Sequence, residues 1–489
     1  MKTFPVLVLI VGSTLSAADE EQVQIPKPSV EVQVVASRLS GHTVDADKVP
    51  VASVVITREE IEKSAATTVA DILAEQPEVV AYDLAGNGKE AVLDLRGFNE
   101  GRAAAIFLDD VRINEPDDNR TLLSQIPLEW VDRIEIFKGA SSSVLGGGAL
   151  SGAIRIYSTR DEGNRVKLTG GSYSSGRMAA EHNQSVSFGK ISIGAGYDRS
   201  DGFRENSESR QGWLRTGLHR SFGSGTMGLA YSYSSSRFGL PSALTAAELE
   251  QDRYASPYNK VDEDSFKTHL FSADFQVARK ATLFSGNAFL RSNGADALTT
   301  GRYAQMYGGF ATQARNTSGG TTLQMSTPII NDQTTLTAGT ELSWIKLDAD
   351  GFYTDVTGKR TGPASSTKTT ENWQAAFAQI ETTLMDRVSI FASGRYDWQS
   401  IDFDDIMTKY SAARTFDKGT FKAGTSFSWD SYSTSFVSYS TAFQTPTILD
   451  LFAYPLFGSN PDLRPSIART LEVGQRFKQK HLSFEISVF

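Results

Sequence analysis

Side chains that commonly carry out catalysis or bind metals are sparse in this chain of 489 residues. The sequence has no cysteine, which excludes a thiol nucleophile, a cysteine zinc site and a disulfide framework. The five histidines are too far apart in the sequence to form a local metal pair: His42, His182, His219, His269 and His481. Because we find neither a catalytic triad pattern nor a metal-ligand spacing, the sequence predicts no enzyme and no cofactor.

Two other clusters could bind ions, but each has a plainer explanation. The glycine-rich stretch at 146–152 lacks the lysine and the surrounding βαβ unit of a phosphate-binding loop. Segments 238–266 and 399–418 are acidic and could hold calcium, although surface loops of secreted proteins are commonly acidic. The net charge is −9, from 48 Lys+Arg and 57 Asp+Glu, and we find no basic stripe for nucleic acid. The sequence therefore predicts no nucleic-acid partner and leaves calcium open.

The first residues predict export from the cytoplasm. Lys2 precedes an apolar stretch at 6–11, and small residues at 16–18 fit a signal-peptidase site, so we expect a signal peptide at 1–18. No later segment approaches the roughly 18 consecutive apolar residues of a membrane-spanning helix. An exported chain of this kind is periplasmic, extracellular or an outer-membrane barrel.

The segments that follow the signal peptide differ in pattern. Residues 19–45 are polar and contain prolines, which indicates a mobile tail. Residues 46–160 mix helical and strand patterns. Thr57 and Glu60 have the spacing of a capping box, which predicts a helix that begins there and runs to about Lys63. We further expect a helix at 69–75 and strands at 104–108 and 131–137.

From about Arg165 onward, apolar and hydrophilic residues alternate with a period of two. In one such stretch Met227, Leu229 and Tyr231 alternate with smaller residues. A membrane barrel alternates in this way because lipid lies outside and water or polar protein inside, although a soluble β-sandwich alternates too. Aromatic residues at strand ends and connectors of alternating length favour the barrel.

The connectors give a strand count and an orientation. Short turns are expected near 223–225, 278–281, 385–386, 430–431 and 479–480, and long loops at 238–266, 294–313, 347–370, 399–418 and 443–467. We assign the long loops to the cell exterior. The tally is about fifteen strands between Val166 and Phe489, whereas a closed barrel with both ends in the periplasm needs an even number. The sequence therefore predicts either a miscount by one or a barrel that is incomplete in this chain.

Four ordered motifs lie between residues 95 and 156. They are LRG at 95–97, FLDDVRIN at 107–114, VDRIEIFKG at 131–139 and SVLGGGALSGAIRI at 143–156. This series resembles the plug domain of TonB-dependent outer-membrane receptors. The resemblance implies a mainly β fold, in which an α+β plug at 46–160 fills a transmembrane antiparallel β-barrel formed by 161–489. Asp110 stands where that family usually has glycine, a departure that touches only a turn.

The resemblance also implies which residues carry function. A TonB box, which pairs as an added strand with a TonB-type energy transducer in the periplasm, would comprise Glu31, Val32, Gln33, Val34, Val35 and Ala36. A charge cluster that locks the plug to the barrel wall would comprise Arg96, Arg133, Glu135 and Glu472. Plug apices facing the ligand would carry Asn87, Lys89, Asn114, Asp117 and Arg120.

Two later motifs, at 441–452 and 460–465, resemble paired boxes of the same family. In haem receptors a histidine usually lies between these boxes, and none lies between Phe443 and Pro465. More than a hundred residues normally follow the boxes in this family, whereas 24 follow here. The family pattern therefore favours truncation of a 22-strand barrel, with a natural smaller barrel as the alternative.

The expected function follows from the resemblance. It implies active import of a metal chelate across the outer membrane of a Gram-negative-type bacterium, with the lipid bilayer and the TonB-type transducer as partners. Family frequency favours a ferric siderophore, and cobalamin is the alternative ligand. A passive pore or an adhesin needs neither a plug nor a TonB box, and a truncated chain could be non-functional.

Overall fold

The computed structural model describes residues 33–35, 37–39, 43–45, 50, 52–83, 91–98, 102–159, 162–241, 243–258, 260–301, 308–330, 333–385, 387–452, 459–479 and 482–489. The predicted signal peptide at 1–18 lies outside these residues. In the segment predicted as a mobile tail, β1 (Gln33–Val35) pairs antiparallel with β2 (Thr43–Asp45). Residues 37–39 are buried, which differs from the expected mobility, and the contacts responsible are given below.

The plug, defined here as residues 52–159, is a small α+β unit. Its five-stranded sheet has the order β3-β8-β9-β6-β7, in which β6 and β9 are parallel and the other pairs are antiparallel. The bounds are β3 Ser53–Ile56, β6 Ala104–Leu108, β7 Val111–Arg112, β8 Val131–Lys138 and β9 Gly152–Ser158. The separate pair β4 (Val79–Asp83) and β5 (Ala91–Leu95) and the short helices η2 (Leu123–Gln125), η3 (Leu128–Trp130) and α3 (Ser142–Leu145) complete it.

Two capped helices cover this sheet, and the sequence predicted both helices and the first of the two caps. Helix α1 (Arg58–Lys63) begins after Thr57, whose side chain accepts from the backbone of Glu60 while the Glu60 carboxylate accepts from that of Thr57. Helix α2 (Val69–Ala74) has an equivalent box, and its apolar face is buried against the isoleucines and leucines of the sheet. The caps satisfy N–H groups that a short helix leaves unpaired, which explains why such short segments are helical.

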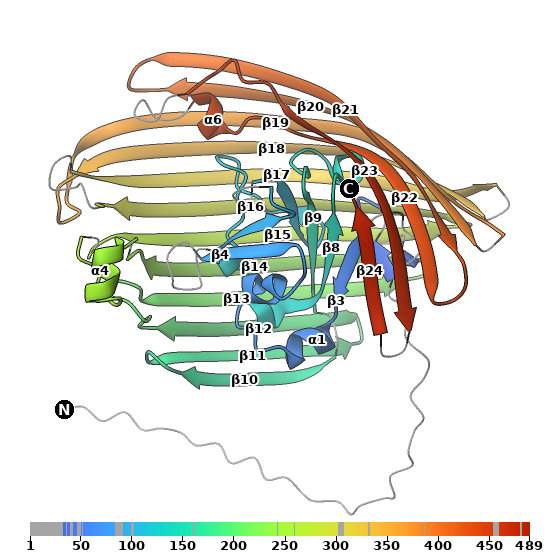
Figure 1. The fold of residues 1–489 in the computed structure, drawn as a ribbon, viewed down its shortest axis with the longest axis horizontal. Helices are drawn as coiled ribbons and strands as arrows, with labels where there is room; N and C mark the ends of the chain where they lie inside the picture. The colour runs from blue at the N-terminus through green and yellow to red at the C-terminus, as the bar shows by residue number, and fades with distance from the viewer. Residues whose placement is uncertain are drawn as a thin grey trace, which may run out of the picture. The chain divides into compact units, whose positions relative to one another are not determined.

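Residues 163–488 form one antiparallel sheet of fifteen strands, the barrel sheet, which curves around the plug (Figure 1). This confirms the predicted fold class and the tally of about fifteen strands. The bounds are β10 Gly163–Gly171, β11 Ser175–Val186, β12 Gly189–Ser200, β13 Ser209–Phe222, β14 Gly225–Gly239, β15 Glu263–Arg279, β16 Thr282–Thr299, β17 Gly309–Ile330, β18 Thr334–Thr354, β19 Arg360–Leu384, β20 Val388–Asp405, β21 Tyr410–Ser428, β22 Ser433–Gln444, β23 Ser466–Gln479 and β24 Leu482–Val488. Helices α4 (Ala246–Gln251) and α6 (Ile448–Phe452) lie in its connectors.

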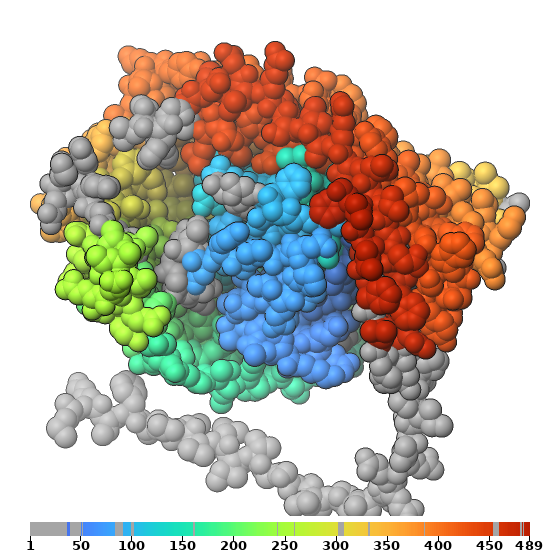
Figure 2. Space-filling model, in the orientation of Figure 1, coloured from blue at the N-terminus to red at the C-terminus, as the bar shows by residue number. Residues whose placement is uncertain are grey.

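The barrel sheet is open within the described residues. Each strand pairs with the next along the chain, and the edge strands β10 and β24 each have one neighbour in the sheet. In Figure 2 the blue plug surface is therefore in view between the green first strands and the red last strands. Among the described helices, none is long and apolar enough to cross a bilayer.

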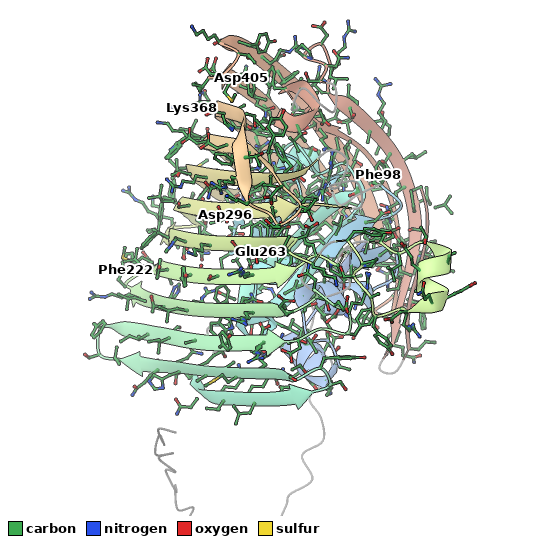
Figure 3. All side chains as sticks on the ribbon, turned by 90° about the vertical axis from the view of Figure 1, so that its left-hand side faces the viewer. Phe98, Phe222, Glu263, Asp296, Lys368 and Asp405 are labelled. Carbon is green, nitrogen blue, oxygen red and sulfur yellow. The ribbon has the colours of Figure 1, made fainter. Side chains whose placement is uncertain are left out.

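Three of the five long loops expected from the sequence are mostly strand. The connectors at those places shrink to 300–308, 355–359 and 406–409, because the flanking strands β16 to β21 are 18 to 25 residues long. A barrel strand needs only about 9–11 residues to cross a bilayer. The outer ends therefore project into water and carry many polar residues, which made them resemble loops. Figure 3 labels three charged side chains on these extensions, Asp296, Lys368 and Asp405.

Candidate functional site

One buried ion pair joins the plug to the barrel sheet. Arg96 Nη2 lies 2.7 Å from Glu472 Oε1 of β23, and these side chains are 1% and 3% exposed. Arg96 Nε also lies 2.6 Å from Glu78 of the plug. Burial acts against ionisation of Glu78, yet the hydrogen bond from Arg96 keeps the pKa of that carboxyl below its ordinary value. A side chain at Gly139 would come within 3.1 Å of Arg96 Nη1, so the glycine leaves room for the guanidinium.

The other two residues expected in this lock lie elsewhere in the plug. Arg133 Nε is 3.1 Å from Glu135 Oε1, two residues along β8. The Glu135 side chain is fully buried, and the Arg133 guanidinium lies 3.9 Å from the centre of the Tyr157 ring. The structure thus brings Arg96 to Glu472 across the plug and the barrel sheet, and joins Arg133 to Glu135 inside the plug.

A second contact between plug and barrel sheet was not predicted from the sequence. Glu115, after β7, forms an ion pair with Arg291 and accepts hydrogen bonds from Asn293 Nδ2 at 3.0 Å and Asn316 Nδ2 at 3.2 Å. The sequence feature that could have indicated this contact is the placement of Arg291 and Asn293 at alternate, inward-facing positions of β16. That signal identifies the wall residues of the contact, but not their plug partner.

A cavity lies between this region of the plug and the inner wall of the barrel sheet. Its charged and aromatic lining residues are Arg38, Arg112, Glu115, Phe289, Arg291, Glu341, Trp344, Glu371, Trp373 and Arg395. Amide and hydroxyl side chains, among them Asn114, Gln399 and Thr445, line the same space. Arg112 donates to Gly147 O at 2.7 Å and lies over the Trp373 ring at 5.5 Å. The mixed polar and apolar lining suits a small-molecule ligand better than bulk water.

The expected apex residues fall into three groups. Asn114 lines the cavity, and its side chain also accepts from Ile106 N at 2.9 Å, which ties it to β6. Asp117 O accepts from Leu449 N of α6 at 3.1 Å, and Arg120 pairs with Asp118 at 2.8 Å. Asn87 and Lys89 lie outside the described residues.

The Asp117 carboxyl lies in an acidic part of the plug apex. Burial, together with the negative charges of Asp118 and Glu115, raises the pKa of its carboxyl to about 7. Because α6 belongs to a connector of the barrel sheet, the Asp117–Leu449 contact links that connector directly to the plug.

The tail reaches the same cavity through Arg38. Arg38 Nε and Nη2 lie 2.9 and 3.0 Å from the two carboxylate oxygens of Glu341, which also pairs with Arg395 at 3.1 Å. Leu39 N donates to Gln324 Oε1 at 3.1 Å. These contacts account for the burial of residues 37–39.

The expected TonB box lies immediately upstream of this anchored segment. Gln33, Val34 and Val35 form β1, which occupies one edge of a two-stranded sheet. Glu31, Val32 and Ala36 lie outside the described residues. Within the part of the chain that the structure describes, no group of three His, Asp or Glu side chains is placed to hold a metal ion.

Comparison with known proteins identifies the family. Residues 45–153 match the model of the TonB-dependent receptor plug domain, and residues 155–489 match that of the TonB-dependent receptor-like β-barrel. The vitamin B12 transporter BtuB of Vibrio vulnificus (strain CMCP6) is 24% identical over 428 residues. The match covers 86% of this chain and 63% of BtuB, so the chain spans less than two thirds of that relative's length.

Solved structures share the fold. The unliganded ferric citrate transporter FecA superposes with a TM-score of 0.77 at 16% identity, over 91% of this chain and 70% of that one. The siderophore receptor PiuA from Acinetobacter baumannii gives 0.75 at 14% identity, over 94% and 74%. Since the two family models together cover nearly all of the sequence after residue 44, the chain belongs to the TonB-dependent receptor family.

Proposed function

We propose that this protein imports a metal chelate across the outer membrane, with energy supplied by a TonB-type transducer in the periplasm. The observation that carries the proposal is the continuity from cavity to tail, because Arg38 lines the cavity and lies within seven residues of every position of the TonB box. The matched family consists of receptors and transporters, which confirms the expectation that the chain is not an enzyme.

Glu341 couples ligand binding in the cavity to release of the tail. This carboxylate holds Arg38 of the tail and Arg395 of β20, and all three side chains line the cavity. A ligand that offers a hydrogen-bond acceptor to either arginine competes with Glu341 and weakens the hold on Arg38. The box around Gln33–Val35 then becomes available as an added strand for the transducer, which pulls on the plug.

The ion pairs between plug and barrel sheet fit this role. Charge pairs hold the plug in one pose, since a buried pair is costly to break while one partner stays buried. In a continuous apolar core no water can replace a lost contact. In an ion pair, water and other polar groups can replace either partner once the plug moves. The Arg96–Glu472 pair and the Glu115–Arg291 pair are two such contacts.

An outer-membrane location is supported by the outward face of the barrel sheet. Leu229, Phe271 and Leu290 lie on neighbouring strands, point away from the plug and are 48–53% exposed. A broad apolar surface of this kind needs lipid to cover it. We therefore place the barrel sheet in the lipid bilayer of the outer membrane of a Gram-negative-type bacterium.

For the ligand we propose a ferric siderophore, in line with the structural relatives that carry ferric chelates. Vitamin B12 is the second candidate, because a curated sequence relative is a vitamin B12 transporter. The two are distinguished by uptake of radiolabelled ferric siderophores and radiolabelled cyanocobalamin. The host is a Gram-negative strain from which the native receptors have been removed and in which this protein is expressed from the gene that encodes it. Uptake is measured in cells with and without the TonB-type transducer.

A matched pair of tryptophan variants tests whether the cavity is the site. Trp373 faces the cavity from β19, whereas Trp398 lies on the neighbouring strand β20 and is 48% exposed on the outward face. We expect Trp373→Ala to reduce ligand binding at least about tenfold, as for loss of an aromatic contact at a binding site, and Trp398→Ala to leave it unchanged. Equal effects of both variants, or uptake that does not need the transducer, would contradict the proposal.

A further inference from the structure

The turn between β6 and β7 contains two aspartates where a glycine would be the ordinary choice. Asp109 and Asp110 have backbone φ angles of 47° and 67°, the left-handed region that favours glycine. The side chain at position 110 therefore occupies a conformation with a steric cost. It makes an ion pair with Arg155 of β9, whose side chain is 2% exposed.

Arg155 in turn holds the backbone of the tail. Its Nη1 donates to Ser37 O at 2.8 Å, and its Nη2 donates to Arg38 O at 3.4 Å. The backbone carbonyl of Asp110 accepts from Arg38 Nη1 at 3.1 Å and from Asn287 Nδ2 of the barrel wall at 3.2 Å. One turn of the plug thus contacts the tail twice, through its carboxylate by way of Arg155 and directly through its own carbonyl.

These contacts differ in position from the Arg38–Glu341 pair. Arg38 and Glu341 line the ligand cavity, whereas Asp110 lines a second, polar cavity with Leu39, Arg133 and Asp274. Neither Asp110 nor Arg155 is among the residues that line the ligand cavity. A ligand that displaces Glu341 from the Arg38 side chain therefore leaves the bonds from Arg155 to the backbone carbonyls of Ser37 and Arg38 in place.

We propose that Asp110 and Arg155 are positioning residues that form a second anchor for the tail, separate from the ligand cavity. The first anchor, Glu341, responds to the ligand. The second anchor sets how much of the tail is released, both when Glu341 holds Arg38 and when it does not. This inference rests on the proposed function only in that the released tail is offered to a transducer. The anchor itself can be measured without ligand or transducer.

The absence of cysteine from the sequence makes a direct measurement possible. Ser37 is 1% exposed, so a Ser37→Cys thiol reacts with a soluble maleimide only when the tail leaves its place. The substitution leaves the carbonyl that Arg155 binds. The experiment compares the labelling rate of the folded, full chain in outer-membrane vesicles, in the Ser37→Cys background, for Asp110→Gly, Asp110→Asn and a matched control, Asp118→Asn.

The two variants at position 110 separate the anchor from folding. Glycine accepts the φ of 67° without strain, so Asp110→Gly removes the carboxylate while easing the backbone. Asp110→Asn keeps the side-chain size and removes the charge. Asp118 pairs with Arg120 in a neighbouring plug turn and provides the control for loss of a plug carboxylate.

We expect Asp110→Gly to speed labelling at least about tenfold, since a charge-assisted contact to a buried arginine is lost. Asp110→Asn should give a smaller increase in labelling rate. Asp118→Asn should change the rate less than about twofold, because Asp118 pairs with Arg120 and not with residues 37–39. The labelling rate of the Asp110→Gly, Glu341→Gln double variant should exceed that of either single variant, because the anchors are separate. Labelling at the wild-type rate in both Asp110 variants, or no added effect over Glu341→Gln, would overturn the proposal. Faster labelling in a protein that fails to transport would support the anchor and count against the proposed function.

Discussion

Replacing Glu472 by glutamine tests the buried pair that joins the plug to the barrel sheet. The change keeps the side-chain shape and a hydrogen-bond acceptor, but it leaves the Arg96 guanidinium without the charge that lies 2.7 Å away. Removing one partner of a buried pair costs about 3–5 kcal/mol. Because Arg96 keeps Glu78 at 2.6 Å, we take the lower end, about 3 kcal/mol.

Amide hydrogen exchange measures this loss where it occurs. Segment 91–98 holds Arg96, whose backbone N–H donates to Glu78 O at 2.9 Å, so exchange in this segment reports how firmly Arg96 is held in place. A loss of about 3 kcal/mol corresponds to exchange about a hundredfold faster, since each 1.4 kcal/mol is a factor of ten. The control is Glu62→Gln, which removes a half-exposed pair with Arg58 and should change exchange by about twofold or less.

A double variant adds an internal check. In Arg96→Gln with Glu472→Gln, both charges of the pair are removed together, and Glu78 retains Lys138 at 3.3 Å. The double variant should therefore exchange more slowly than Glu472→Gln alone. An increase below about fivefold in Glu472→Gln, or a double variant that sums the single effects, would refute the reasoning that the pair locks the plug.

Three further predictions concern the plug apex and its glycine-rich turn. Glu115→Gln should lower the free energy of unfolding by about 2 kcal/mol, since Arg291 is left without its charge partner while the amide contacts survive, and an unchanged denaturation midpoint would count against this. The pKa of Asp117 is raised from 3.8 to about 7, so its stabilising contribution is fully present below about pH 4 and is lost as pH rises to about 7. Thermal unfolding of Asp117→Asn should lack this part of the pH dependence, and identical pH profiles would contradict it. Gly147→Ala would place a Cβ 2.8 Å from Trp373, so overpacking should cost about 1–3 kcal/mol and lower the thermal midpoint, and a midpoint equal to wild type would show that the ring moves freely.

Local signals in the sequence predicted several elements well. The capping box at Thr57 and Glu60 gave the start of α1 because both partners lie within one turn of helix. Strict alternation gave the strand tally because the barrel sheet has one apolar face wherever lipid covers it. The pairing of Arg96 with Glu472 followed from resemblance, since 376 residues separate them and nothing local links their positions.

The sequence did not predict contacts between residues that lie far apart along the chain. Residues 37–39 look like polar tail, and only the fold brings Arg38 to Glu341 and Arg155. Asp110 looked like a small departure at a turn, yet its side chain reaches a buried arginine. Outer strand ends carry many polar residues because water surrounds them, so their composition gave no sign that 347–370 is mostly strand.

The most direct test of the account is Val34→Pro in the TonB box, measured by ligand uptake and ligand binding in the same cells. Proline removes the backbone N–H that an added strand requires, and the substitution leaves Arg38, the tail residue that lines the cavity, unchanged. The account predicts that transducer-dependent uptake is lost while ligand binding stays at the wild-type level. Uptake that continues at the wild-type rate in Val34→Pro would contradict the claim that this receptor is driven by a partner that pairs with its tail.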